Sequence, residues 1–378
     1  MYFVDDRGVL LDELAQRLYA LNPSATLIWC DLTERLEPAE IVSRLERRTE
    51  LARDQAAQQV AAILDRWRDL GLLEGGEPPV TATRRAPRAA PIGRVRAAVT
   101  PVVARDYRLL DSRIRLSFAT AGLRDRVDAM LAPFADPEDS VARSDLLLAP
   151  LGQGCALREG EALLHCCHTA EEIVPMLKLA LAERALAEAD AACAAHAALL
   201  RRQGQGLLLA GRSGSGKSTL AAALDGRGFA ALGDDTAVLG HADLAARALN
   251  FGICLKTGAW PLFAPRMPDL VELPVHRRPD DRMVRYLPTS ARTDSSAGIP
   301  VRWLVFPSYR PGADPGLIPL APAEALQRLM DGFVPLRERL SASLVESLIG
   351  WISSLHSAAL VHDDLDTAVQ SIDAFCQP

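Results

Sequence analysis

The chain of 378 residues is long enough for roughly two or three domains, and its 49% hydrophobic and 24% charged residues are typical of a globular protein. Its net charge of −6 argues against a general nucleic-acid binder, and its seven irregularly spaced cysteines indicate reduced thiols and not a disulfide framework. Asp5 and Asp6 stand where a signal peptide needs basic residues, and no apolar run reaches about 18 residues. We therefore expect a cytoplasmic protein that binds neither membrane nor nucleic acid.

The first seventy residues predict three short strands followed by three helices. The predicted strands are Tyr2–Val4, Val9–Leu11 and Arg17–Leu21, and the predicted helices are Ala25–Leu32, one that opens at Glu37-Pro38, and Ala52–Leu70. On the last helix, Val60, Leu64 and Trp67 recur at helical spacing, and Gly71 ends it. This order predicts a small winged-helix-like domain over residues 1–76.

Two short motifs in this domain resemble the PqqD family, also called the RiPP recognition element. They are Leu21–Trp29 (LNPSATLIW) and Asp69–Leu73 (DLGLL). The family binds leader segments of ribosomally made precursor peptides, so the resemblance implies a precursor peptide as partner. Its binding mode implies that the leader adds a strand beside residues 17–21 and lays apolar side chains against the helix 52–70.

The same residues fit two other interpretations. Trp29 and Trp67 are also what plain core packing would require. A nucleic-acid-binding winged helix is a rival class of domain. It is disfavoured by Asp54, Asp65 and Asp69 on the third helix, because these carboxylates would repel phosphates.

A stretch rich in proline, glycine, alanine and arginine follows the first domain. It predicts a semi-extended linker over residues 77–92 and a second domain over residues 93–378. The first elements predicted in the second domain are a strand Arg113–Phe118, a helix Leu123–Phe134, a strand Leu146–Pro150, a hairpin turn at Arg158–Gly160 and a long helix Thr169–Ala192.

The stretch Gly211–Ser218 (GRSGSGKS), here called the glycine loop, fills every fixed position of the phosphate-binding pattern G-x-x-x-x-G-K-[ST]. An apolar strand run precedes it and a helix-forming run follows it, so backbone N–H groups and the positive end of a helix dipole meet there. We predict that the loop binds ATP through Gly211, Ser213, Gly214, Ser215, Gly216, Lys217, Ser218 and Thr219. Lys217 would contact the β- and γ-phosphates and Ser218 would ligate Mg²⁺. The alternative is a glycine-rich turn without a ligand.

Polar residues that suit catalysis flank the loop. A predicted strand His196–Leu200 turns at Gln203–Gln205 into the strand that feeds the glycine loop, which places His196 near it. A further strand, Phe229–Leu232, ends in Gly233 followed by Asp234 and Asp235. Two adjacent carboxylates beside a phosphate loop can divide metal binding and proton transfer between them. A buried structural histidine and a solvated acidic turn are the alternatives.

The order of His196, the glycine loop, Gly228 and the pair Asp234-Asp235 resembles the HPr kinase/phosphorylase family. It is most similar to the HPr-kinase-related proteins encoded with PqqD-like partners in peptide-modification systems. The resemblance implies a mixed α/β, PEP-carboxykinase-like fold with the phosphate loop at the centre of its sheet. It also implies that Asp235 is the general base, Asp234 a magnesium-side acid, and His196 a neighbour that steers the base or the phosphate.

The chain departs from this family downstream of the acidic pair. The glycine-rich, arginine-containing signature that supports phosphorolysis and HPr recognition is not found, which argues against both properties. Lys256 and Arg302 are candidates for contact with a phosphate or an acidic substrate, and Lys256 equally fits a surface lysine. Residues 274–293 predict a mobile loop that acts as a substrate lid, and residues 322–375 predict a helical tail that packs on the second domain or mediates a homo-oligomer.

These features together predict an ATP-dependent serine kinase. Its first domain would capture a precursor peptide, and its second would phosphorylate a hydroxyl of that peptide with ATP and Mg²⁺. Two other functions remain open: a peptide chaperone or adaptor that binds nucleotide without transfer, and a small-molecule kinase that its first domain regulates.

Overall fold

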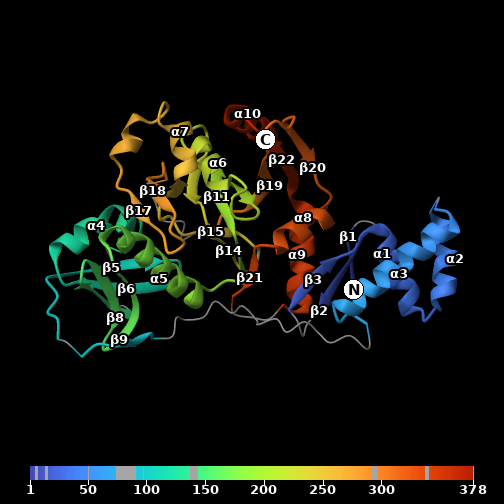
Figure 1. Ribbon diagram of the computed structural model, residues 1–378, viewed down its shortest axis with the longest axis horizontal. Coiled ribbons are helices and arrows are strands. Elements are labelled where there is room, and N and C mark those ends of the chain that lie inside the picture. The colour runs from blue at the N-terminus through green and yellow to red at the C-terminus, as the bar shows by residue number, and fades with distance from the viewer. Residues whose placement is uncertain are drawn as a thin grey trace. The chain divides into compact units, whose positions relative to one another are not determined.

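The computed structural model groups the chain into two compact units, which Figure 1 shows with their elements labelled. The first unit comprises Met1–Arg84, Leu320–Met330 and Glu338–Ser357, and the second comprises Arg85–Pro319, Asp331–Arg337 and Ala358–Pro378. The structure describes residues 1–4, 7–12, 16–49, 51–73, 91–96, 98–136, 144–291, 297–336 and 340–377. Most of the predicted linker, residues 77–90, lies outside these ranges.

The N-terminal strands and helices of the first unit form where the sequence predicts them. They are β1 (Tyr2–Val4), β2 (Arg7–Asp12), β3 (Arg17–Ala20), α1 (Pro23–Thr33), α2 (Pro38–Arg48) and α3 (Arg53–Asp69), with the strands in the order β1-β2-β3. The first helix begins two residues earlier than predicted, because the Asn22 side chain accepts a hydrogen bond from the Ala25 N–H at 2.8 Å and Pro23 stands in the first turn.

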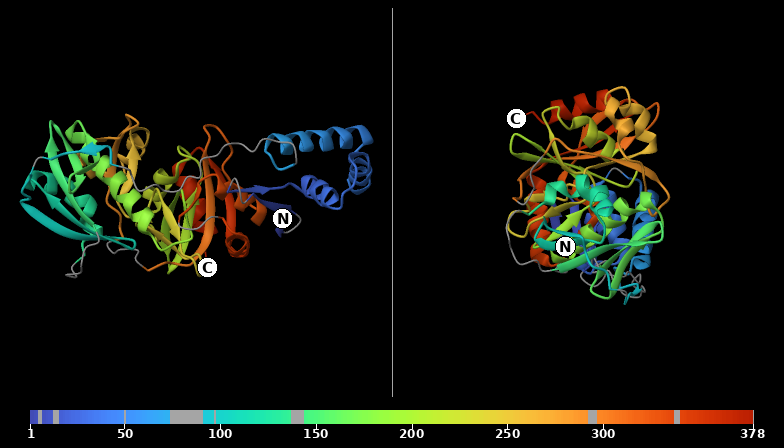
Figure 2. Two further views of the ribbon diagram at one scale, coloured as in Figure 1. Left: turned by 90° about the horizontal axis from the view of Figure 1, so that it is seen from below. Right: turned by 90° about the vertical axis from the view of Figure 1, so that its left-hand side faces the viewer.

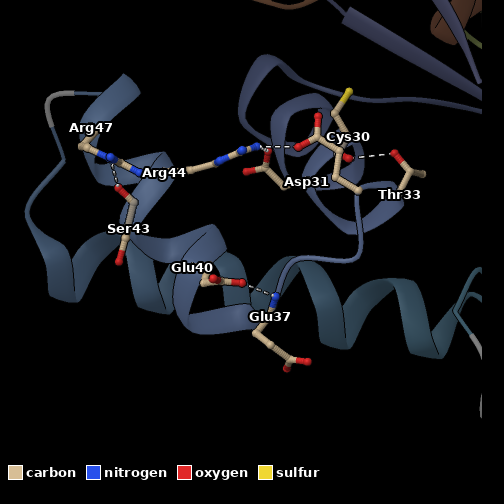
Figure 3. A network of polar contacts seen from close by, with 9 residues as sticks. Cys30, Asp31, Thr33, Glu37, Glu40, Ser43, Arg44 and Arg47 are labelled. Atoms are coloured by element: carbon tan, nitrogen blue, oxygen red, sulfur yellow. Dashed lines mark hydrogen bonds and ion pairs between the residues drawn. The ribbon is translucent and has the colours of Figure 1, made fainter.

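Polar contacts fix the corner between α1 and α2 (Figure 3). Arg44 on α2 reaches back to α1, where its guanidinium lies 2.9 Å from the Asp31 carboxylate and 2.7 Å from that of Glu34. Asp31 is only 4% exposed at its side chain, so this ion pair also satisfies a buried charge. At the start of α2, the Glu40 side chain accepts from the Glu37 N–H at 3.0 Å and closes a capping box.

The sheet β1–β3 is covered on both faces. Leu10 and Tyr19 point toward α1–α3 and join the core formed with Ile28 and Trp67. Because side chains alternate along a strand, the neighbouring Val9, which is fully buried, points to the opposite face. There α8 (Pro322–Met330) packs against β2 and β3, and α9 (Ala342–Ser354) packs against β1. Figures 1 and 2 show the strands lying between the two groups of helices.

This second layer of helices differs from the sequence prediction. Residues 322–375 were expected to form a helical tail of the second domain, and residues 93–378 a single domain, yet α8 and α9 group with the N-terminal unit. The tail also contains two strands, β21 (Phe333–Pro335) and β22 (His356–His362), before α10 (Leu365–Phe375). Helical periodicity describes α8 and α9 correctly, but it carries no information on which sheet a helix covers.

The second unit begins with a six-stranded sheet in the order β4-β9-β8-β7-β6-β5. Its elements are β4 (Gly93–Arg94), β5 (Val103–Leu109), β6 (Ser112–Phe118), α4 (Ala121–Leu131), β7 (Ser144–Leu151), β8 (Gly154–Glu159), β9 (Ala162–Cys167) and α5 (Ile173–Glu188). Both helices pack on this sheet around Phe118, Leu148 and Leu157. The long helix predicted over Thr169–Ala192 is shorter, because Ala189, with a ψ angle of 132°, leaves the helical conformation before the next strand, β10 (Cys193–Ala195).

A second six-stranded sheet, here called the central sheet, carries the glycine loop. Its strand order is β13-β11-β12-β19-β22-β20, with β11 (Ala197–Arg202), β12 (Gln205–Ala210), β13 (Ala230–Gly233), β19 (Val301–Tyr309) and β20 (Gly316–Pro319). The helices α6 (Lys217–Leu224) and α10 pack together on this sheet around Leu209, Leu220 and Leu360.

Strand direction brings several loops to one edge of the central sheet. β11 is antiparallel to both β12 and β13, so β12 and β13 run in the same direction, and β19 is parallel to β12. The Arg310 N–H, just after β19, donates to the His362 carbonyl at the end of β22 at 2.9 Å, so β22 also runs parallel to β19. The segments that follow β12, β13, β19 and β22 therefore share one edge, here called the loop edge.

Two smaller sheets complete the described part of the second unit. Their orders are β15-β14-β10-β21 and β16-β18-β17, with β14 (Ala237–Leu239), β15 (Ala246–Ala248), β16 (Ile253–Lys256), β17 (His276–Arg277) and β18 (Met283–Leu287). The predicted mobile lid over residues 274–293 instead contains β17 and β18, which pair with each other, and β18 also pairs with β16. Two of its arginines, Arg277 and Arg285, therefore lie within paired strands.

The position of α9 against β1 predicts that truncation of its buried face loosens the N-terminal sheet. Leu348 is fully buried, so Leu348→Ala should cost about 2–5 kcal/mol of local stability. Hydrogen exchange at the amides of β2 would measure this as lost protection. Glu346→Ala, at an exposed position of the same helix, is the matched control and should change stability by less than about 0.5 kcal/mol. Unchanged protection in Leu348→Ala would mean that α9 does not support the sheet.

Candidate functional site

The loop edge gathers most of the residues that the sequence singles out. The glycine loop follows β12, Asp234 and Asp235 follow β13, and His196 lies between β10 and the start of β11. His196 itself is not in a strand as predicted, because the strand begins at Ala197. Parallel neighbours in a sheet bring their carboxyl ends together, which is where ligands bind in open α/β sheets.

The backbone of the glycine loop turns through conformations that favour glycine. Gly211, Gly214 and Gly216 have φ angles of 138°, 89° and 98°, which side-chain-bearing residues rarely adopt. Gly216 is the N-cap of α6, and the Leu220 N–H already donates to its carbonyl at 2.9 Å. The first N–H groups of α6 therefore lack partners within the helix and point toward the loop, as an anion site requires.

Lys217 is folded back onto the glycine loop. Its Nζ donates to the carbonyls of Gly211 at 2.6 Å and Arg212 at 3.0 Å, and the residue is only 5% exposed. Burial lowers the pKa of Lys217 to about 8, while the negative charge of Asp235 opposes this shift. The ammonium group of Lys217 is thus held beside the loop and has lost part of its hydration. An anion bound between the loop and Lys217 would stabilise the charged form of this side chain.

Asp235 is held by two basic side chains. The Nδ1–H of His196 donates to the Asp235 carbonyl at 2.8 Å, and the same nitrogen lies 3.3 Å from the carboxylate. Lys178 Nζ, from α5, lies 3.6 Å from the other carboxylate oxygen. The hydrogen bond from His196 and the charge of Lys178 hold the pKa of Asp235 well below its usual range, so the carboxylate is ionised at physiological pH.

Asp234 and Lys256 lie beside this pair. Asp234 is 4% exposed, and its Oδ2 accepts from the Cys254 N–H on β16 at 2.9 Å. Lys256 ends β16, and it lies close enough to lower the pKa of Lys217 further. Arg302, by contrast, stands at the start of β19, at the opposite edge of the central sheet, with its guanidinium 5.3 Å from the centre of the Trp303 ring. The structure therefore does not bring Arg302 to the other predicted residues.

The prediction assigned the metal role to Ser218 and Asp234. Ser218 lies in the first turn of α6 and is half-buried, next to the half-buried Thr219. Within the described ranges, no three His, Cys, Asp or Glu side chains are arranged to hold a metal by themselves. A site built from one hydroxyl and one carboxylate would need phosphate oxygens as its other ligands, which is how Mg²⁺ usually binds beside nucleotides.

Two residues at this site, Lys178 and His362, are not predicted from the sequence. Lys178 interrupts the apolar run Ile173–Leu181 on α5, and a lone lysine in a buried helix is a signal that could have been followed. His362 ends β22 and is 4% exposed. Its strand had been assigned to the helical tail, so its place at the loop edge was not anticipated.

A second candidate site lies at the free edge of β3, in the first unit. The Leu21 N–H donates to the Gly8 carbonyl, so Leu21 and Gly8 form a hydrogen-bonded pair at the end of the β2–β3 ladder. Hydrogen-bonded and non-hydrogen-bonded pairs alternate along an antiparallel ladder, so the backbone N–H and C=O groups of Leu18 and Ala20 point away from β2. No strand pairs with this edge among the described residues. Trp29 and Trp67 pack edge to face beside it in the α1–α3 core, with their centroids 5.1 Å apart.

Comparison with known families assigns the N-terminal part of the chain. Residues 7–73 match the family model described as Coenzyme PQQ synthesis protein D (PqqD). This segment spans β2, β3 and α1–α3, so it is a PqqD-like domain, and the resemblance inferred from the motifs at Leu21–Trp29 and Asp69–Leu73 is confirmed. A comparison with curated proteins finds no match to the chain. None of the described helices is long and apolar enough to cross a bilayer.

The depressed pKa of Lys217 predicts pH-dependent nucleotide affinity. Below pH 8 the ammonium is charged and can pair with phosphate, whereas above pH 8 the complex must take up a proton. The apparent Kd for ATP should therefore rise about tenfold per pH unit above pH 8. Calorimetric titrations with ATP at pH 7.5, 8.5 and 9.5 would measure this.

The matched control for this prediction is Lys217→Arg. A guanidinium stays charged across this range, so the affinity of the variant, even if weaker, should not change with pH. A wild-type affinity that is equal at pH 7.5 and 9.5 would contradict the role of Lys217 as a phosphate partner.

Proposed function

We propose that this chain is an ATP-dependent kinase that phosphorylates a serine hydroxyl of a ribosomally made precursor peptide captured by its PqqD-like domain. The observation that carries the proposal is the convergence of the glycine loop, Lys217, Asp234, Asp235 and His196 at one sheet edge of a chain whose N-terminal domain is PqqD-like. Neither feature alone points to a peptide kinase, but a PqqD-like domain and a loop with the phosphate-binding pattern in one chain together support this proposal.

Capture would use the free edge of β3. A leader in extended conformation can accept from the Ala20 N–H and donate to the Leu18 carbonyl, which adds a fourth strand to the sheet. Alternate side chains of the leader would then fall on the face of α3, where Ile63 is half-buried. Because α8 and α9 cover the other face of the sheet, the apolar side chains of a leader can pack only on the face that carries α3.

Phosphoryl transfer would take place at the loop edge. Backbone N–H groups of the glycine loop and Lys217 would bind the phosphates of ATP, and Mg²⁺ held by Ser218 and Asp234 would neutralise their charge. The serine oxygen bonds to the γ-phosphorus, the bond from that phosphorus to the β–γ bridging oxygen breaks, and ADP leaves. The hydroxyl proton passes to Asp235.

The low pKa of Asp235 is compatible with this role. The transition state of phosphoryl transfer is loose in most analyses, so the hydroxyl loses its proton late and needs orientation more than a strong base. A carboxylate fixed by His196 and Lys178 is always ionised and is held in place. The same contacts also fit a purely structural Asp235, and for that reason the peptide adaptor without transfer activity remains the second candidate function.

Fusion of the two parts would raise the effective concentration of the acceptor. A peptide held by its leader meets the active site at an effective concentration that can reach the millimolar range, so the acceptor segment needs little affinity of its own. This explains why one kinase could act on peptides whose acceptor segments differ.

The capture step predicts that a proline in β3 weakens peptide binding. Ala20→Pro removes an N–H that points to the free edge and leaves the β2–β3 hydrogen bonds intact. Peptides selected against the intact chain from a random display library should bind this variant at least tenfold more weakly. Phe3→Pro is the matched control, because the Phe3 N–H points outward from β1 at the opposite edge of the same sheet. Equal binding to both variants would rule out the β3 edge.

The transfer step predicts that Asp235→Asn abolishes turnover but not binding. A positioned base typically contributes about 10²–10⁴-fold, so transfer of phosphate from ATP to the selected serine-containing peptides should fall at least a hundredfold. Phosphopeptide is measured by mass spectrometry, and ATP affinity by calorimetry. Asp314→Asn, at an exposed position, should behave as wild type. The adaptor is favoured instead if wild type binds ATP and peptide yet forms no phosphopeptide.

A further inference from the structure

His362 lies beside the glycine loop, although it is far from it in sequence. It ends β22 at the loop edge and is 4% exposed. A Cβ added at Gly216, the N-cap of α6, would lie 3.8 Å from Nε2 of His362. On its other side the imidazole makes an edge-on contact with the Tyr309 ring, with 5.8 Å between centroids. The ring is therefore fixed with Nε2 toward the start of α6.

The polar atoms of His362 are unsatisfied. Within the described part of the chain, neither Nδ1 nor Nε2 has a hydrogen-bond partner, and the same is true of the buried Oγ of Ser215 in the glycine loop. Buried polar atoms almost always have partners, because an unpaired one loses its hydration without compensation. Two such atoms at one loop, Nε2 of His362 and Oγ of Ser215, indicate a place that is completed by a ligand.

The chemistry around His362 indicates an anionic ligand. Its neighbours are the start of α6, with its unpartnered N–H groups and positive dipole end, and a loop that already holds the Lys217 ammonium. Burial lowers the pKa of His362, although the backbone of Asp364 and the charges of Asp363 and Asp364 oppose this shift, so the imidazole is neutral and carries one N–H. A neutral imidazole can donate one hydrogen bond to an anion without adding a further charge to a site that must release its product.

We propose that His362 is a phosphate-binding residue, donating a hydrogen bond from its imidazole to a phosphate oxygen of the nucleotide held by the glycine loop. This inference rests on the proposed nucleotide-binding function and assigns it a contact from β22, outside the Gly211–Ser218 motif. It also offers a partner to the unpaired Ser215 Oγ, which belongs to the same loop.

The test compares His362→Phe with wild type. The phenyl ring keeps the shape and the contact with Tyr309 but removes both nitrogens, so the nucleotide-free Tm should be equal or higher, since two unsatisfied atoms are lost. The Kd values for Mg²⁺–ATP and for inorganic tripolyphosphate, measured by calorimetry, should both rise about 10- to 100-fold. His362→Gln retains a donor and should lose less affinity than His362→Phe. His356→Phe, at the exposed start of the same strand, is the matched control and should bind as wild type.

Each other outcome decides against the inference in a distinguishable way. Unchanged affinity for both ligands in His362→Phe would remove His362 from the site and leave the proposed nucleotide function intact. Weaker ATP binding with unchanged tripolyphosphate binding would show that His362 contacts the nucleoside and not the phosphates. A wild-type chain that binds neither ligand would overturn the proposed function together with this inference. Should the phenyl ring not be accommodated, His362→Leu carries the same measurements.

Discussion

The common direction of four strands in the central sheet is the constraint on which the candidate site depends. Because β12, β13, β19 and β22 end at one edge, backbone geometry alone brings the glycine loop, the acidic pair and His362 together, although Gly211 and His362 are 151 residues apart in the sequence. The charges there are closely balanced. The charges of Asp234 and Asp235 raise the pKa of Lys178 and oppose the lowering of the pKa of Lys217 by burial. An anionic ligand beside Lys217 would therefore favour its charged form.

Local patterns in the sequence predict the local structure well. The apolar runs of β1–β3, the cap at Asn22, the proline at the start of α2 and the glycine after α3 each act over a few residues, and each predicted element forms, with α1 and β2 each beginning two residues earlier than predicted. The glycine loop is predictable for the same reason, since its φ angles are required within eight consecutive residues. The hairpin predicts that His196 lies near the glycine loop, and the family resemblance implies that it steers either the base or the phosphate; in the structure it contacts Asp235.

Features that depend on distant segments were not predictable. The sequence predicts a helix at β22, because its short apolar run, Ser357–Val361, lies between two helical stretches. The strand conformation of this run depends on its pairing with β19 and β20, which are distant in the sequence. Lys178 lies on a helix of the other sheet, so its ion pair with Asp235 has no signature in the sequence around either residue. The apolar faces of α8 and α9 predict that each helix packs against another element. They do not predict that this element is the sheet β1–β3, more than 300 residues earlier in the sequence.

The assembly of the first unit from both ends of the chain has a consequence for synthesis on the ribosome. The PqqD-like segment is translated before the segments that cover the second face of its sheet, which begin at residue 320, some 236 residues after residue 84. At about 5–20 residues per second, this interval lasts roughly 10–50 s. During that time Val9 and its neighbours on that face, and both sheet edges, are open to other chains, which is a known route to aggregation. The first unit is thus completed only after most of the second unit has been translated.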